Sequence, residues 1–102
     1  MNPPPLTSEQ RKRALAKAAK VRRRRAEIKA DLSDRRLTIS ELLERTDQFA
    51  VGGMKVSAVL LALPGIGKKR AGRLMERVGI IENRRLRGLG KRQREDLIRA
   101  LS

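Results

Sequence analysis

The chain has 102 residues, of which 26 are Lys or Arg and 11 are Asp or Glu, so its formal net charge is +15. It contains neither Cys nor His, which excludes disulfides, zinc fingers, thiolate nucleophiles and imidazole bases. A charge of this size attracts polyanions, and nucleic acid is the leading candidate because neutralising phosphates releases counterions.

The large apolar residues lie mostly in the second part of the chain, with 23 in residues 37–102 and 6 in residues 1–36. We therefore expect one domain overall, made of a basic N-terminal helical arm over 1–36 and a compact helical core over 37–102. The arm has 12 cations and 4 acids and the core 14 cations and 7 acids, so both are able to contact a polyanion. Because there is no run of about 20 apolar residues and no signal peptide, we expect a soluble, cytoplasmic protein without a membrane partner.

The first predicted element is a long helix over residues 8–32, because no Gly or Pro occurs between Leu6 and Val51. Thr7 and Gln10 form a capping box that starts it, and its length would be roughly 37 Å. Its apolar side is thin until Ile28 and Leu32, which are spaced to dock on the core, so the first part is expected to project into solvent. Four consecutive arginines are either a solvated charge run or arm contacts to a polyanion: Arg22, Arg23, Arg24 and Arg25.

A second helix is predicted to begin at Thr38, which forms a capping box with Glu41, and to end before the sequence VGG at 51–53. The glycines at 52 and 53 allow a sharp reversal into a third, buried helix. This helix carries apolar residues at helical spacing, namely Val56, Val59, Leu60 and Leu63.

A glycine turn follows, with the sequence LPGIGKKR. Pro64 disfavours helix in the residue before it, and Gly65 and Gly67 allow positive φ or close backbone approach. The next helix starts at this turn, faces Ala71, Leu74, Met75 and Val78 inward and ends at Gly79. Its N-terminal amides, its dipole and three cations suit a phosphate, against the alternative of a purely structural turn. The candidate residues are Leu63, Pro64, Gly65, Ile66, Gly67, Lys68, Lys69 and Arg70.

A second turn, LRGLG at 86–90, repeats LPGIG at an offset of 23, either as a degenerate internal repeat or as an unrelated turn of similar chemistry. Six cations and no acid lie between residues 84 and 94, including Arg94, whereas a solvated surface normally mixes signs. We therefore expect polyanion contact here as well. The candidate residues are Arg84, Arg85, Arg87, Gly88, Leu89, Gly90, Lys91 and Arg92, together with Lys55.

The first turn resembles the helix-hairpin-helix and helix-two-turns-helix motifs, which bind duplex nucleic acid through hairpin amides. Nearly the whole chain is similar to the actinobacterial integration host factor family, through PLTSEQR, KAAKVRRRRAEIK, MKVSAVLLALPGIGKKRA and RRLRGLGKRQ. The resemblance implies an all-α fold in which a long N-terminal helix precedes a compact core with a helix-two-turns-helix (HhH-like) element, followed by a basic lid over 81–93.

The resemblance also implies a function. It predicts a nucleoid-associated architectural protein that binds double-stranded DNA with little sequence specificity, bends or compacts it, and influences supercoiling, recombination and transcription. From the composition we expect no enzyme activity, cofactor, metal or small-molecule substrate. We expect a monomer that bridges or clusters on DNA. If about 6 to 8 phosphates are neutralised, log K should fall with log salt at a slope of roughly −5 to −7.

Two alternatives differ in class. RLRGLGKRQ is also similar to the glycine turn of bacterial ribosomal protein S13, so a structured-RNA-binding or ribosome-associated protein is the second hypothesis; single strands are disfavoured because one Phe and no Tyr, Trp or His offer almost no stacking platform. Helix-hairpin-helix glycosylases pair a lysine with a nearby aspartate, yet here no Asp follows Lys69 until Asp96. An enzyme is therefore not expected.

Overall fold

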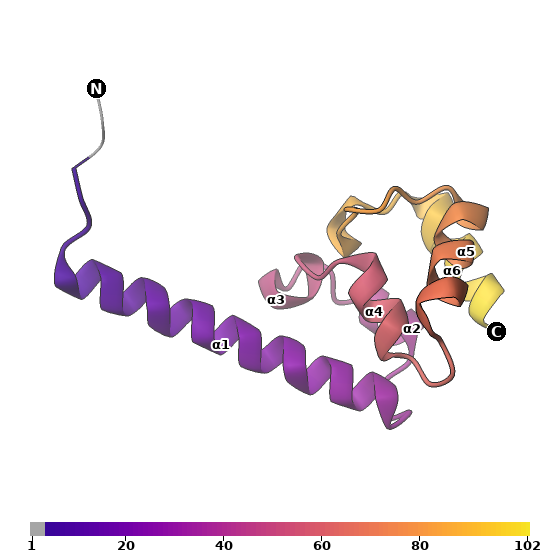
Figure 1. Ribbon diagram of the computed structural model, residues 1–102, viewed down its shortest axis with the longest axis horizontal. Coiled ribbons are helices and arrows are strands. Elements are labelled where there is room, and N and C mark those ends of the chain that lie inside the picture. The colour runs from indigo at the N-terminus through magenta and orange to yellow at the C-terminus, as the bar shows by residue number, and fades with distance from the viewer. Residues whose placement is uncertain (1–3) are drawn as a thin grey trace.

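The computed structural model describes residues 4–102, so residues 1–3 of the predicted arm lie outside the described residues. Within that range the regular structure is helical, and the one extended pairing is an isolated antiparallel bridge between Lys55 and Arg85. The predicted all-α class is confirmed (Figure 1). The elements are α1 (Ser8–Ser33), α2 (Ile39–Leu43), α3 (Phe49–Gly52), α4 (Val56–Ala62), α5 (Lys68–Val78), the 3₁₀ helix η1 (Leu86–Gly88) and α6 (Lys91–Leu101).

Helix α1 has the predicted start and length. The Thr7 hydroxyl accepts from the Gln10 amide at 3.1 Å, and the Gln10 side chain accepts from the Thr7 amide at 2.9 Å. Only the last turns of α1 reach the core, where Ile28 and Leu32 are buried, and the preceding turns extend away from the other helices (Figure 1). None of the helices in the described part of the chain combines the length and apolarity that a membrane span requires.

The predicted second helix is wrong in extent, because α2 ends at Leu43 and α3 begins only at Phe49. Its start is as predicted, since Thr38 and Glu41 form the capping box. At its other end the Leu43 carbonyl accepts from the Thr46 hydroxyl at 3.4 Å and from the Arg94 guanidinium at 3.1 Å. These side chains occupy an acceptor that a longer helix would use, and the chain turns.

Gly52 and Gly53 do lie where the chain reverses, but positive φ is not the reason. The φ of Gly53 is −84°, and Gly52 lies within helix α3. What both positions need is space: a Cβ on Gly52 would collide with the Thr46 carbonyl, and one on Gly53 with the Arg25 guanidinium. The two glycines therefore allow α3 to pack closely between its neighbours.

The core is formed where α4 packs against both α1 and α5, while α6 closes the other side of α5 and contacts α2. Among residues 4–102 no polar or charged residue is buried. The predicted inward positions of α4 and α5 are buried or half-buried, and Gly79 ends α5 in the left-handed conformation at φ 81°. The charged side chains therefore lie on the surface of this small core and not in its interior.

Candidate nucleic-acid interface

The first turn joins α4 to α5 and leaves the N-terminus of α5 open. Gly65 has a φ of 76°, which favours glycine, whereas Gly67 is the N-cap of α5 with an ordinary φ of −93°. No side chain caps this helix. Helical bonding begins with the Ala71 amide, which donates to the Gly67 carbonyl at 2.9 Å, so the preceding amides have no helical partner.

A Cβ placed on Gly67 would meet no atom of the chain within 4 Å. The fold therefore does not require glycine there, and the missing side chain exposes the α5 amides. Ile66, the apolar residue between the two glycines, is buried in the core. Lys68, Lys69 and Arg70 are exposed beside the amides, so the turn combines backbone donors and mobile positive charge.

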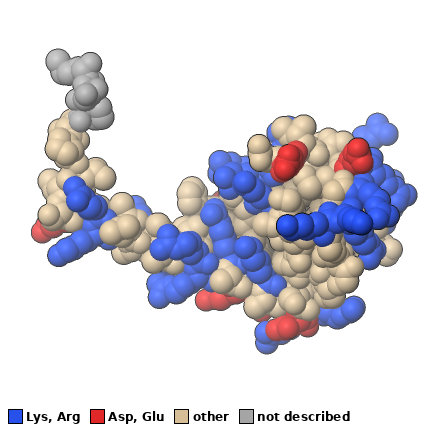
Figure 2. Space-filling view, in the orientation of Figure 1, with Lys and Arg blue, Asp and Glu red and all other residues tan. Residues whose placement is uncertain are grey.

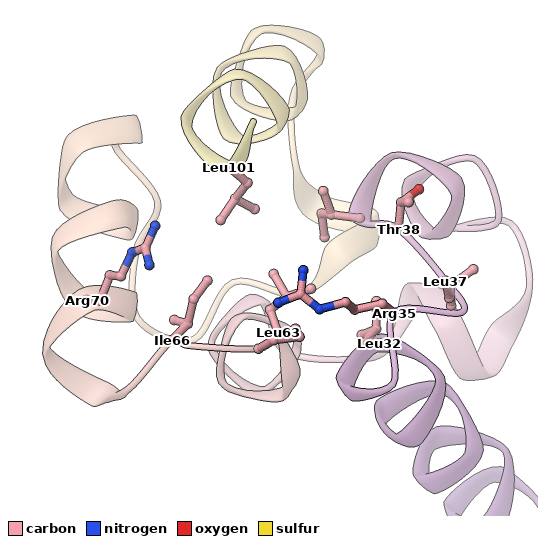
Figure 3. A pocket seen from close by; sticks show the side chains of 10 residues that line it. Leu32, Arg35, Leu37, Thr38, Leu63, Ile66, Arg70 and Leu101 are labelled. Atoms are coloured by element: carbon pink, nitrogen blue, oxygen red, sulfur yellow. The ribbon is translucent and has the colours of Figure 1, made fainter.

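A cavity of about 330 Å³ lies beside this turn, at the junction of α1, α2, α5 and the end of α6. Its floor is apolar, and the side chains of Arg35 and Arg70 point into it from opposite sides (Figure 3). Neither guanidinium has an acidic partner in the described part of the chain. Arg36, by contrast, pairs with Asp31 at 3.5 Å and with Asp34 at 2.8 Å.

Arg35 is the cation near the first turn that the sequence reasoning did not identify. It has a φ of 63°, a left-handed conformation that is uncommon for a residue with a Cβ. A helical C-terminus followed by two arginines gives no way to tell which one will be neutralised. The backbone geometry separates them, since it directs Arg35 towards the first turn and Arg36 towards α1.

The lid residues are fixed to the junction between α3 and α4. The Val56 amide donates to the Arg84 carbonyl at 3.0 Å, and the Leu86 amide donates to the Met54 carbonyl at 2.9 Å. Arg85 donates from its guanidinium to the Gly53 carbonyl, and Leu86 is fully buried. These bonds place Lys55 directly beside Arg85. The predicted lid is therefore held to the core by backbone hydrogen bonds.

The three lid arginines differ in how much of their charge is free. Arg87 is exposed, and its Cβ lies 3.3 Å from where a Cβ of Gly52 would be. Arg84 is half-buried against Gly88, and its Nε is buried without a hydrogen-bond partner. A buried guanidinium nitrogen without an acceptor is costly, so this side chain is placed to gain from an anion that reaches it.

The second turn repeats the helix start of the first but not its first glycine, because Gly65 has a positive φ whereas Gly88, 23 positions later, lies in η1 without one. Gly90 is the N-cap of α6 as Gly67 is of α5, both in extended conformation, and Leu89 is buried like Ile66. The difference is that Gln93 accepts from the Gly90 amide at 2.9 Å, so the second helix start is partly capped. The offset of 23 residues therefore corresponds to two similar turns of different openness.

Not every cation of the second turn is free. Arg94 is half-buried and donates to the Leu89 carbonyl, the Leu43 carbonyl and the Thr46 hydroxyl, at 3.1 to 3.3 Å. It is committed to the fold. Lys91 is exposed, and Arg92 is exposed at 3.8 Å from Asp96.

The four arm arginines also divide. Arg25 donates from Nε to the Ala50 carbonyl at 2.9 Å, and Arg24 lies 3.6 Å from Glu27. Arg22 and Arg23 are exposed. Two of the four arginines therefore have partners within the protein. Arg22 and Arg23 remain as the arm positions that are either solvated or in contact with a polyanion.

The lid and the first turn lie at opposite ends of α4. Lys55 is the N-cap of this helix and Leu63 its C-cap, so the two sites are roughly 12 Å apart along its axis. Figure 2 shows Lys and Arg over both α1 and the core, with Asp and Glu scattered among them. With a formal net charge of +15, such a surface attracts a polyanion at both sites.

Comparison with known proteins agrees with this geometry. Residues 32–101 match the family described as the S13-like H2TH domain. The chain is 52% identical over 91 residues to the integration host factor of Streptomyces coelicolor, covering 88% of this chain and 85% of that protein. It is 48% identical over 96 residues to the integration host factor of Mycobacterium tuberculosis, covering 93% and 91%. A solved structure described as sIHF bound to an 8-bp palindromic DNA superposes with a TM-score of 0.81 at 46% identity, over 85% of this chain and 99% of that chain.

Proposed function

The chain belongs to the actinobacterial integration host factor family and contains its S13-like H2TH domain, and from this we propose that it is a nucleoid-associated protein that binds double-stranded DNA. The observation that carries the proposal is the open N-terminus of α5. There an uncapped helix start, a glycine whose Cβ position is empty and a group of exposed cations converge on one point of the surface. Phosphate is the anion that this combination suits, because it accepts from several amides at once.

At the first turn, the backbone amides of α5 donate to a phosphate while Lys68, Lys69 and Arg70 add charge around it. Arg35 approaches the same cavity from the end of α1 and contributes a further cation. Such contacts position the protein on the duplex but carry no information about base sequence.

At the lid, Arg84, Arg85 and Arg87 clamp a second stretch of backbone, with Lys55 beside them. The spacing of roughly 12 Å along α4 is comparable to the width of the major groove of B-DNA, about 12 Å. The unpartnered Nε of Arg84 supports this role, since a phosphate or a minor-groove base edge would supply the acceptor that the fold lacks.

Sequence preference should be weak. Gln93, a side chain of the kind that reads adenine edges, is occupied by the Gly90 amide and the Gly79 carbonyl. The relatives are named as host factors rather than enzymes, and we expect no catalysis. Bending or compaction of DNA, and through it effects on supercoiling, recombination and transcription, is the architectural role that we assign to the chain.

The test is fluorescence-anisotropy binding of a 25-bp DNA duplex and of the matching RNA duplex across a salt series. Wild type is compared with a variant in which Arg84, Arg85 and Arg87 are changed to alanine. We expect DNA to bind more tightly than RNA, a scrambled DNA sequence to bind nearly as well, and a salt slope of roughly −5 to −7 that becomes shallower in the variant. Tighter RNA binding would instead support the structured-RNA function that the S13-like domain also suits.

A further inference from the structure

Phe49 is the one aromatic residue of the chain and it lies in solvent, with 72% of its surface exposed. The core of this small protein contains only nineteen buried apolar residues among those that the structure describes. Leaving the largest apolar side chain outside forgoes stabilisation that its burial would contribute. A single exposed apolar side chain is ordinary on a protein surface, so what would cover the ring has to be argued from its neighbours.

The surroundings of Phe49 identify what that is. The Gly53 amide donates to the Phe49 carbonyl at 3.2 Å, so Phe49, Gly52 and Gly53 follow one another along one side of α3. At Gly52 this side faces first the Thr46 carbonyl and then the Cβ of Arg87, and at Gly53 it faces the guanidinium of Arg25. The exposed ring therefore lies about one helical turn from an arginine of the lid and an arginine of the arm.

We propose that Phe49 is an apolar wedge that enters a base step of duplex DNA through the minor groove, while the exposed Arg87 of the lid holds a phosphate beside it. The inference rests on the proposed DNA-binding function. A rigid ring among cations suits this contact, because bases offer an apolar stacking surface directly behind a wall of phosphate charge. Inserted apolar side chains unstack the step and kink the duplex. Distortion of DNA, for which the family resemblance was the basis above, thereby acquires a specific residue.

A second copy of the chain is the other occupant that an exposed ring suggests. The charges around Phe49 oppose it, because two such surfaces would bring Arg25 and Arg87 of both copies together, and the exposed Asp47 offsets only one of these two charges in each copy. A duplex removes the same repulsion and supplies the apolar contact. The tests below separate these outcomes.

The first test uses Phe49→Trp. Because the chain has no Trp or Tyr, this indole is the only strong fluorophore, and its environment reports directly on position 49. On saturation with a 25-bp duplex we expect its emission to be quenched and its accessibility to acrylamide to fall several-fold. If anisotropy shows saturation while the accessibility stays at its free value, the wedge is overturned and the DNA-binding proposal stands. Protection that grows with protein concentration in the absence of DNA would also overturn the wedge, in favour of self-association.

The second test compares Phe49→Ala with Phe49→Leu, and uses Leu15→Ala as the control because Leu15 is similarly exposed, at 62%, away from the lid. The bend is measured by energy transfer between dyes at the two ends of the duplex. We expect Phe49→Ala to bind DNA but to lose most of the change in end-to-end distance, Phe49→Leu to keep it, and Leu15→Ala to match wild type. Helix content by circular dichroism confirms that each variant is folded. Equal bending by Phe49→Ala and wild type would overturn the proposal.

Discussion

The Nε of Arg25 donates to the carbonyl of Ala50 at 2.9 Å, across 25 positions of sequence, and ties the arm helix to α3. The same guanidinium fills the space that the absent side chain of Gly53 leaves open. One arginine of the four is therefore part of the tertiary structure and joins α1 to α3 beside the buried Ile28 and Leu32.

Changing Arg25 to alanine should lower the free energy of unfolding by about 1 to 2 kcal/mol, because it leaves the Ala50 carbonyl without its charged donor. The matched control is Arg23→Ala, at an exposed position, which should change stability by less than about 0.5 kcal/mol. Urea unfolding followed by circular dichroism measures both. Equal stabilities of the two variants would mean that the Arg25 contact contributes nothing to the fold.

Substitution by alanine should affect protein stability at Gly65 but hardly at Gly67. Gly65→Ala places a Cβ on a residue with a φ of 76° and should destabilise the protein by about 1 to 2 kcal/mol. Gly67→Ala has an ordinary φ and its methyl group meets no atom within 4 Å, so its stability should change by less than about 1 kcal/mol. The methyl group would nevertheless fill part of the empty space at the start of α5 that a bound phosphate needs.

DNA affinity should therefore fall in Gly67→Ala without a matching loss of stability. Thermal unfolding and anisotropy on the same two preparations give the comparison. A Gly67→Ala variant that binds DNA as tightly as wild type would show that no phosphate approaches the α5 amides.

Arg35 and Arg36 are adjacent, but only Arg35 lacks an acidic partner in the described part of the chain. Arg35→Ala should weaken DNA binding and make the salt slope shallower by about 1. Arg36→Ala should do so less, because its charge is already offset by Asp31 and Asp34.

A third substitution, Arg35→Gly, separates charge from backbone. It should weaken binding as alanine does and raise the free energy of unfolding by about 1 kcal/mol relative to Arg35→Ala, because glycine adopts the left-handed conformation without strain. Salt-dependent anisotropy and urea unfolding are the measurements. If Arg36→Ala has the larger effect on DNA binding, the first turn receives its extra cation from a different side chain.

The capping box at α2 should make stability fall in acid. The pKa of Glu41 lies below its ordinary value. The main cause is the hydrogen bond from the Thr38 amide to the Glu41 carboxylate, and the Thr38 hydroxyl and the charge of Arg45 add to it. A carboxyl whose folded pKa is lowered contributes stability above its unfolded pKa of about 4.3 and loses it as the pH falls through the folded value.

Thr38→Ala should melt at a lower temperature than wild type at pH 7. The difference between their melting temperatures should become smaller as the pH is lowered past this range. Melting temperatures of both proteins at several pH values measure it. Because the alanine variant keeps the backbone amide, a difference that stays constant from pH 7 to pH 3 would contradict the coupling between the Thr38 hydroxyl and the Glu41 carboxylate.

Elements decided by neighbouring residues were predictable from the sequence. The capping boxes at Thr7 and Thr38, the positive φ of Gly65 and the left-handed end of α5 at Gly79 each depend on residues a few positions apart. The break between α2 and α3 was not predictable, because it depends on Arg94 binding the Leu43 carbonyl across 51 positions.

The candidate interface divides in the same way. The two glycine turns are visible as a repeat, but which cations around them are free depends on tertiary partners. No local sequence pattern predicts the bonds of Arg94, the attachment of the lid through Lys55 and Arg85, or the left-handed backbone of Arg35. Composition alone assigns all of these cations equally to the polyanion.

The division of the chain into an arm and a core leads to the last prediction. Removing residues 1–20 deletes Arg11, Lys12, Arg13, Lys17 and Lys20 but keeps Arg25, Ile28 and Leu32, which contact the core. The shortened protein should therefore unfold cooperatively at nearly the same urea concentration as the full chain. Its DNA affinity should be lower and its salt slope shallower if the arm lies along the duplex, and unchanged if the arm is only solvated. Removing residues 1–32 instead deletes two fully buried side chains and should prevent folding, because each costs about 2 to 5 kcal/mol when lost from a core. A folded protein after the longer deletion would show that the core over 37–102 is stable without α1.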